Sequence, residues 1–119
     1  MKLELGFRVW IRYNDTVFGE GLFQLLRRVG SSGSISHAAA DMKMSYRQAW
    51  GKIRKAEKVM GVRLVEAKAG GHLGGGTRLT PEGEDLLSRY GKFRDEVTRL
   101  VEESFFRHFQ GSLWVGQGQ

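Results

Sequence analysis

The sequence contains no cysteine among its 119 residues, which excludes disulfide frameworks, cysteine-based zinc sites and thiol nucleophiles. It also lacks an apolar run near the roughly 20 residues that span a bilayer. Acids and arginines are mixed through the N-terminal segment, unlike the pattern of a signal peptide. We therefore expect a cytoplasmic protein without a membrane partner. The 40% hydrophobic and 27% charged residues are typical of one folded domain.

Residues that usually carry catalysis or bind metals are sparse and poorly spaced. His37, His72 and His108 share no ligand spacing, and no cysteine could complete a set with them. The acids within residues 82–85 stand at a predicted helix start, where interaction with the helix dipole explains them. No local Ser-His-acid pattern is present. The sequence therefore predicts no enzyme, no metal site and no cofactor.

Positive charge is concentrated in one stretch of the chain. Residues 43–63 hold seven of the 19 Lys and Arg side chains and a single acid, Glu57. That stretch carries a net charge of +6, equal to the formal charge of the whole chain, so the other residues balance to zero. A field focused in this way suits a polyanion, of which nucleic acid is the commonest. The alternative is an ordinary solvated helix face.

The N-terminal third changes its hydrophobic period once. The first 13 residues alternate apolar and polar side chains, which predicts a strand with one buried face, and Asn14-Asp15 supplies a turn. From Phe18 the apolar residues recur every three or four positions, which predicts an amphipathic helix that ends at Gly30. The expected buried face of the strand consists of Leu3, Leu5, Phe7, Val9, Ile11 and Tyr13.

Two capped helices are expected next. Ser34 is placed to cap a short helix, and Met44 to close the turn after it. Ser45 and Gln48 form an S-x-x-Q capping box at the start of a helix that ends at Gly61. The buried positions expected in these two helices are Ile35, Ala38, Ala39, Met42, Ala49, Ile53, Ala56 and Met60.

The C-terminal half predicts a hairpin and then a long helix. Residues 62–80 form two short strands around a glycine-rich loop, and Thr80-Pro81-Glu82 is a strong helix start. The helix over 81–106 has apolar side chains at alternating four- and three-residue steps, typical of a seam against another helix. A domain this small cannot bury roughly 25 helical residues along their whole length, so we expect a partner chain. The predicted dimer interface consists of Leu86, Tyr90, Phe93, Val97, Leu100, Val101 and Phe105.

Three helices followed by a hairpin is the order of a winged helix-turn-helix. We expect an α+β, mainly α fold with residues 1–119 as a single DNA-binding domain. Its parts are an N-terminal strand segment, a three-helix core at 18–60, a glycine-rich wing at 62–80 and a dimerisation helix at 81–106.

The helix over 45–60 is expected to lie in the DNA major groove, with its first turn toward base edges. Arg47 can pair with guanine and Gln48 with adenine. Alternatively, both are solvated side chains on an exposed first turn without a role in binding. Tyr46 either contacts DNA or props the turn, and Trp50 is expected to pack against the wing or first helix. The predicted DNA-binding residues are Ser34, Ser45, Tyr46, Arg47, Gln48, Lys52, Arg54, Lys55, Lys58, Lys68, His72 and Arg78.

Five motifs in a fixed order carry a family resemblance: GSIS at 33–36, alanines at 38–40, SYRQAW at 45–50, the glycine-rich hairpin at 70–76 and LTPEG at 79–83. Residues 18–105 resemble the DNA-binding domain of the molybdate-responsive ModE family, itself similar to the LysR-type winged helix. The resemblance implies a homodimer, joined through the last helix and the N-terminal segment, that binds a palindromic operator. It also implies regulation of transcription, often of molybdenum or tungsten uptake.

Full-length members of that family carry C-terminal oxyanion-binding domains, whereas this chain stops at Gln119, so direct molybdate binding is not expected. An alternative function is a winged-helix module that binds a protein or an effector, for which Leu113-Trp114-Val115 offers an apolar surface. A sequence-independent architectural DNA-binding protein is a third option. The glycine loop lacks the lysine of a nucleotide-binding P-loop, and an RNA-clamping loop is its other alternative.

Overall fold

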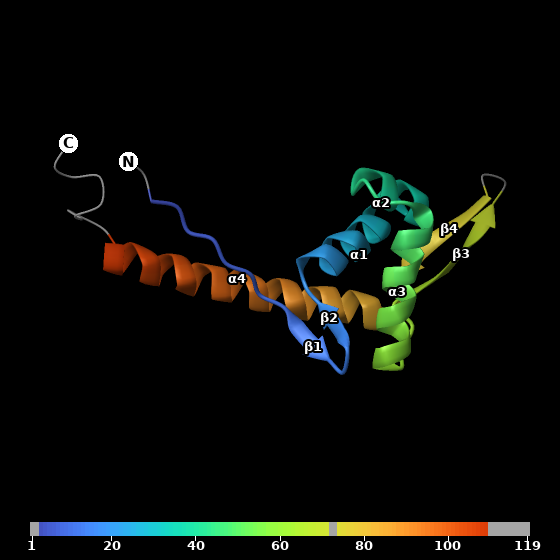
Figure 1. Ribbon diagram of the computed structural model, residues 1–119. Helices are drawn as coiled ribbons and strands as arrows, with labels where there is room; N and C mark the ends of the chain where they lie inside the picture. Colours follow the sequence, from blue (N-terminus) through green and yellow to red (C-terminus); the bar gives the residue numbers. More distant parts are fainter. Residues whose placement is uncertain (1–2, 72–73, 110–119) are drawn as a thin grey trace.

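The computed structural model describes residues 3–71 and 74–109, and it shows a small body from which one long helix projects (Figure 1). The body and this helix together measure 67 × 27 × 22 Å. The elements in chain order are β1 (Ile11–Tyr13), β2 (Thr16–Phe18), α1 (Glu20–Ser32), α2 (Ile35–Asp41), α3 (Tyr46–Met60), β3 (Val65–Gly71), β4 (Gly74–Leu79) and α4 (Pro81–Phe109).

The N-terminal segment differs from the predicted strand. Residues 3–10 are extended but form no strand, and only β1 pairs with β2, across the Asn14-Asp15 turn. The predicted buried face is wrong, because Leu5, Phe7, Ile11 and Tyr13 are exposed. Alternation of apolar side chains favours a strand only where a neighbouring strand is present to pair with it. Residues 3–10 instead follow α4, as Figure 1 shows.

Helix α1 begins and ends later than its sequence pattern predicts. Phe18 belongs to β2, and the helix ends at Ser32, with Gly33 as its cap, rather than at Gly30. Gly33 has a φ of 74° and donates its N–H to Val29 O at 2.8 Å, which is a left-handed cap that glycine adopts without strain. The apolar residues that recur every three or four positions from Phe18 are buried: Phe18, Leu22, Leu25, Leu26 and Val29.

The predicted caps of α2 and α3 are confirmed. Ser34 Oγ accepts the N–H of His37 at 3.1 Å. Ser45 Oγ accepts the N–H of Gln48 at 3.0 Å, and Gln48 Oε1 accepts the N–H of Ser45 at 2.9 Å. The turn between the two helices is made by Lys43, whose φ is 56°, rather than by Met44. The buried residues of these helices are Ile35, Ala38, Ala39, Ala49, Ile53 and Ala56, whereas Met42 and Met60, also predicted to be buried, are only half-buried.

The hairpin of β3 and β4 is fastened to the end of α1. The two strands pair antiparallel, with Val65 opposite Leu79. Thr77 donates its N–H to Gly33 O at 2.9 Å. A Cβ at Gly76 would lie 2.5 Å from the same oxygen, so only glycine allows this approach. The wing therefore has a fixed base beside the helical body.

The start of α4 is locked onto the loop before β3. The Thr80 hydroxyl accepts the N–H of Gly83 at 3.0 Å and donates to Arg63 O, and only 4% of Thr80 is exposed. A Cβ at Gly83 would lie 2.2 Å from Leu64 O, which explains why glycine follows Thr80-Pro81-Glu82. This contact sets the direction in which α4 leaves the body.

Tyr90 is a core residue of its own chain. Its ring meets Phe18 edge-on at 4.9 Å between centroids and Phe23 at 5.2 Å. Its hydroxyl donates to Val9 O at 3.0 Å, and only 2% of the residue is exposed. The predicted place of Tyr90 in the dimer interface is therefore corrected, because the first turns of α4 pack on α1 and Leu86 joins that same core.

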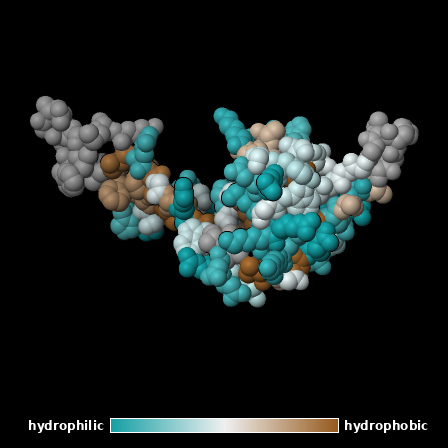
Figure 2. All heavy atoms as spheres, turned by 45° about the vertical axis from the view of Figure 1, so that its right-hand side comes forward, coloured by the Kyte–Doolittle hydropathy of each residue, from teal (hydrophilic) through white to brown (hydrophobic). Residues whose placement is uncertain are grey.

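The rest of α4 leaves apolar side chains on its surface. Phe93 is 46% exposed and Leu100 is 49% exposed, whereas Val97, Val101 and Phe105 are half-buried. Figure 2 shows a hydrophobic patch toward the far end of this helix. Within residues 3–71 and 74–109, no helix is both long and apolar enough to cross a membrane. The tail residues Leu113-Trp114-Val115 lie outside the described part.

Candidate nucleic-acid interface

Helix α3 presents a basic stripe opposite its buried side. At 3.6 residues per turn, Arg47, Gly51, Arg54 and Lys58 fall on one line along the helix, away from the core residues centred on Ile53. All four are exposed. Within the part of the chain that the structure describes, none of the three cations forms an ion pair. We call these four residues the outer stripe.

The single acid of the basic stretch is turned away from this face. Glu57 Oε2 accepts the N–H groups of Leu64 and Val65 at 2.8 and 3.2 Å. It also lies 3.6 Å from Arg63 Nε, and 10% of its side chain is exposed. Sequence reasoning missed this role, because only the path of the chain after α3 brings Leu64 and Val65 to the carboxylate. The outer stripe is consequently free of acids, and the charge of Arg63 is balanced.

The two residues of the first turn of α3 that are predicted to contact bases, Arg47 and Gln48, differ in whether their side chains are free to do so. Gln48 Oε1 is occupied by the capping box, whereas a bidentate pair with adenine needs both the oxygen and the nitrogen of the carboxamide. Arg47 on the same turn is exposed and makes no side-chain hydrogen bond within the described residues. Its guanidinium can therefore pair with guanine O6 and N7 without breaking a cap.

Two aromatic side chains of α3, Tyr46 and Trp50, contact each other beside the outer stripe. Trp50 Nε1 donates to the hydroxyl of Tyr46, and their rings meet edge-on with centroids 6.5 Å apart. The Arg54 guanidinium lies 4.9 Å from the centroid of the Trp50 ring. Trp50 is half-buried and packs on the core, so it fixes the side chains on either side of it. Since the Tyr46 oxygen accepts a hydrogen bond here, its own proton remains available to an acceptor such as a phosphate.

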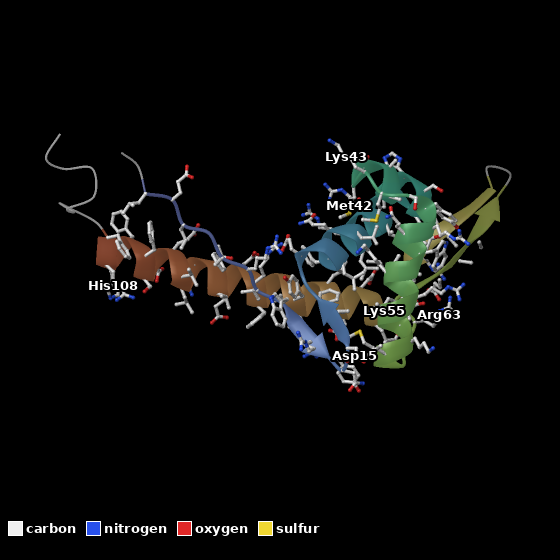
Figure 3. All side chains as sticks on the ribbon, viewed as in Figure 1. Asp15, Met42, Lys43, Lys55, Arg63 and His108 are labelled. Atoms are coloured by element: carbon white, nitrogen blue, oxygen red, sulfur yellow. The ribbon has the colours of Figure 1, made fainter. Side chains whose placement is uncertain are left out.

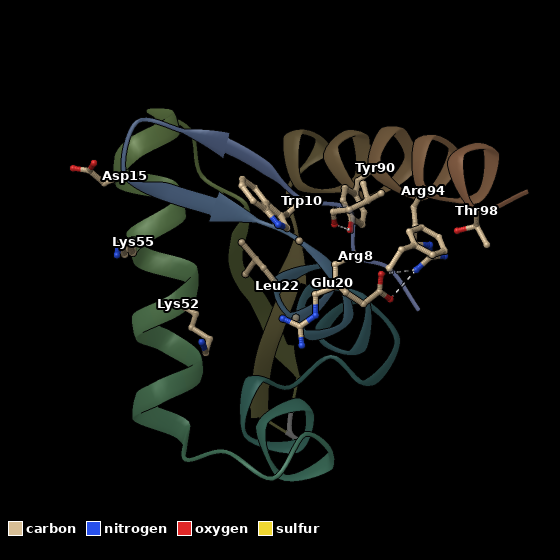
Figure 4. Close-up of a pocket in the computed structure, with 14 residues that line it drawn as sticks. Arg8, Trp10, Asp15, Glu20, Leu22, Lys52, Lys55, Tyr90, Arg94 and Thr98 are labelled. Atoms are coloured by element: carbon tan, nitrogen blue, oxygen red, sulfur yellow. Dashed lines mark hydrogen bonds and ion pairs between the residues drawn. The ribbon is translucent and has the colours of Figure 1, made fainter. Parts of the chain in front are cut away.

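Lys52 and Lys55 occupy the opposite flank of α3. Both line a groove of about 1030 Å³ between α3, the β1–β2 hairpin and the N-terminal segment, which also includes Trp10 (Figure 4). Both side chains are exposed at the groove's edge. The basic residues of α3 thus divide into the outer stripe and this lysine pair, a division that the charge count alone does not reveal.

One ion pair closes the side of the groove nearest α4. Arg94 Nη1 lies 2.8 Å from Glu20 Oε2, and the Arg94 guanidinium lies 4.6 Å from the centroid of the Phe23 ring. Burial opposes ionisation of Glu20, but hydrogen bonds from Gln24 and Arg94 outweigh it and lower the pKa of this carboxyl. The pair links α4 to the start of α1.

The predicted wing and cap residues are partly engaged within the chain. Arg78 Nε lies 3.0 Å from Glu66 Oε2, directly across the hairpin. Lys68 is exposed and has no ion pair among the described residues. Ser34 is half-buried and its hydroxyl caps α2. The predicted contact at His72 falls outside the described part of the chain.

Side chains that could bind a metal are not gathered anywhere in residues 3–71 and 74–109, where no group of three or more His, Asp or Glu has a suitable arrangement. Figure 3 shows the side chains, with His108 near the far end of α4 and Met42 in the helical body.

A protein-family model covers the part of the chain that holds these features. It describes the bacterial regulatory helix-turn-helix protein, lysR family, and it matches residues 21–84. The match runs from the first turn of α1 through the wing to the first turn of α4. It therefore includes the whole outer stripe.

Curated proteins with similar sequences are regulators and molybdenum-related proteins. The transcriptional regulator ModE of Haemophilus influenzae is 38% identical over 82 residues, which cover 69% of this chain and 31% of that protein. The DNA-binding transcriptional dual regulator ModE of Escherichia coli K12 is 41% identical over 81 residues, or 68% and 29%. The molybdenum-pterin-binding protein MopB of Rhodobacter capsulatus is 39% identical over 77 residues, or 65% and 28%. The chain spans less than a third of the length of these relatives.

A solved structure has a similar fold. The protein in the crystal structure of the BenM_DBD/benA site 1 DNA complex matches with a TM-score of 0.58 and 19% identity, over 76% of this chain and 97% of that chain. At this identity the likeness bears on the fold alone. It confirms the predicted fold class, a mainly helical winged helix-turn-helix.

Proposed function

The chain belongs to the bacterial regulatory helix-turn-helix proteins of the LysR family, with relatives named ModE, and from this membership we propose a transcriptional regulator that binds double-stranded DNA. We propose a binding protein rather than an enzyme, with residues 1–119 acting as one DNA-binding domain. Helix α3 is the element that enters the major groove, which is about 12 Å wide.

One observation carries this proposal, namely that the outer stripe is basic, exposed and free of acids. Glu57 lies at the other side of α3 with its carboxylate satisfied by backbone N–H groups, so no negative charge opposes an approaching phosphate backbone. Positive side chains that neutralise phosphates release counterions, which supplies most of the sequence-independent affinity. This arrangement supports DNA binding, because the stripe runs along the exposed side of one helix, the element that a helix-turn-helix places in the major groove.

The side chains take three roles in the proposal. Arg47 reads a base, most simply guanine, because its guanidinium is unengaged in the first turn. Tyr46 and Arg54 are both held by Trp50 and contact the DNA phosphate backbone. Tyr46 acts as a hydrogen-bond donor and Arg54 as a cation. The remaining phosphate contacts come from Lys52, Lys55, Lys58 and Lys68. Gln48 and Ser45 contribute chiefly by fixing the helix start, since their side chains are used in the capping box.

A homodimer on a palindromic operator is also proposed. The exposed apolar side chains of Phe93 and Leu100 on α4 support a partner chain along this helix. A two-fold dimer would place its two α3 helices about 34 Å apart, one helical turn of DNA, so that both meet the same face. Sedimentation of the chain with and without duplex measures this state, and a monomer in both would contradict it.

The molybdenum connection comes from the names of the relatives. Because proteins named ModE and MopB are similar in this domain, we propose target genes that serve molybdenum use. Sequencing the genomic fragments bound by the chain tests this assignment. Fragments without any such gene nearby would argue against it.

The decisive experiment for DNA binding compares two single substitutions on α3. A preferred duplex is first selected from a random pool with the wild-type chain. Arg47→Ala should then remove discrimination at one position, at a cost of about 1–3 kcal/mol on the selected duplex. Lys55→Ala should weaken selected and random duplexes alike and lower the salt slope by about one.

Fluorescence titrations at several salt concentrations give both quantities. A wild-type chain whose affinity is independent of salt would refute DNA binding altogether. An Arg47→Ala variant with unchanged affinity and preference would instead refute the role assigned to the first turn.

A further inference from the structure

Gly51 occupies a position where the fold gives no reason for glycine. It lies in the middle of α3, and glycine is less favourable than any residue but proline inside a helix. Its backbone is not in the left-handed region that glycine favours, unlike that of Gly33 and Gly61. A conformational need therefore does not explain it.

No contact within the chain explains Gly51 either. A Cβ built there would meet nothing within 4 Å in the described structure. At Gly83 a Cβ would lie 2.2 Å from Leu64 O, and at Gly76 it would lie 2.5 Å from Gly33 O. Those two glycines are required by the chain itself, whereas the space beside Gly51 is open.

The position of Gly51 on α3 indicates what fills that space. It follows Arg47 by four residues and precedes Arg54 by three, so it lies between them in the outer stripe. A helix that carries long basic side chains on both sides of a bare backbone has a shallow gap at that point. A flat surface drawn in by the cations can approach the helix axis most closely there.

We propose that Gly51 is the point where the α3 backbone makes its closest approach to the base edges of the DNA major groove. This inference rests on the proposed function and adds a contact residue to it. The missing side chain lets the helix sit deeper in the groove, which brings Arg47 within reach of a base while Arg54 and Lys58 meet the phosphates. An added side chain at residue 51 would hold the helix away from the bases.

The inference predicts two opposite effects of the same substitution. Gly51→Ala should raise the thermal unfolding midpoint by about 3–6 °C, because alanine is the best helix former and has open space there. The same variant should bind the selected duplex about tenfold more weakly, as expected when a methyl group is forced into a close contact. Gly51→Leu should weaken binding further and bring the affinity for the selected duplex toward that for random duplex.

Gly21→Ala is the matched control. Gly21 is also helical, exposed and without atoms within 4 Å of a built Cβ, but it lies on α1. Its variant should keep the wild-type affinity for both duplexes. Titrations with the selected and a random duplex, at one salt concentration, and melting curves of all four proteins provide the comparison.

Each outcome bears on the inference separately from DNA binding itself, which the wild-type titration tests. A more stable Gly51→Ala variant that binds the selected duplex less well supports it. A stabilised variant with wild-type affinity overturns it, and so does a Leu variant that keeps its sequence preference. A Gly51→Ala variant that melts below the wild type overturns the premise that the chain leaves this space open.

Discussion

A substitution of Glu57 tests most directly how this fold keeps an acidic side chain away from the outer stripe. Its carboxylate accepts the N–H groups of Leu64 and Val65 and has little contact with solvent. Glu57→Ala would leave both N–H groups without an acceptor in the structure and would release Arg63 from its acid. We expect a less stable protein that is more positively charged near α3.

The size of the effect follows from the two hydrogen bonds. A hydrogen bond to a charged group contributes about 1.5–3 kcal/mol net. The second of the two is long at 3.2 Å, and water can reach a side chain that is 10% exposed, so the bonds do not add fully. We expect Glu57→Ala to lower the free energy of unfolding by about 2–3 kcal/mol.

Urea denaturation of wild type, Glu57→Ala and Glu66→Ala at one protein concentration measures this loss. Glu66 is the control, because its ion pair with Arg78 is exposed and should contribute less than about 1 kcal/mol. The reasoning is refuted if the two alanine variants lose the same small amount. In a titration with random duplex, Glu57→Ala should bind at least as tightly as wild type, since a positive charge has been released.

Two further predictions concern the attachment of α4. Tyr90→Phe keeps the ring packing but removes the hydrogen bond to Val9 O, so it should cost about 1 kcal/mol and speed amide exchange in the N-terminal segment; unchanged exchange would show that this bond does not hold the segment. The lowered pKa of Glu20 adds stability above its ordinary value of 4.5 that disappears as the pH falls through the folded-state value. Urea denaturation between about pH 6 and 3 should therefore show a smaller loss of stability in Glu20→Gln than in wild type, and equal losses would contradict a role for its bonds with Gln24 and Arg94.

Local patterns predicted the helical body well because they depend on neighbours in sequence. The capping box at Ser45 and Gln48 and the buried stripe around Ile53 need only 3.6-residue periodicity and the unpaired N–H groups of a helix start. The same reasoning misplaced the N-terminal strand, because pairing requires a partner that a sequence pattern does not supply. It also predicted that α1 ends at Gly30. This glycine instead lies within the helix, where it allows close contact with Leu79.

Side-chain roles at the interface were harder to predict, because they depend on residues distant in sequence. Gln48 has the right chemistry for adenine, yet its oxygen is used in the cap. Arg78 has the right charge for the wing, yet Glu66 lies across from it on the hairpin. Tyr90 fits a seam spacing, yet α1 covers it. In each case a competing partner within the chain decided the geometry.

The sequence alone determined the class of fold, the buried faces of α1 to α3 and the basic stretch, since helix periodicity, capping and net charge are properties of neighbouring residues. Only the tertiary structure decided which side of α3 is free of acidic side chains and which tyrosine is buried. It also decided which glycine, Gly51, is required by no contact within the chain. Those features depend on where distant segments meet, and packing in three dimensions fixes that.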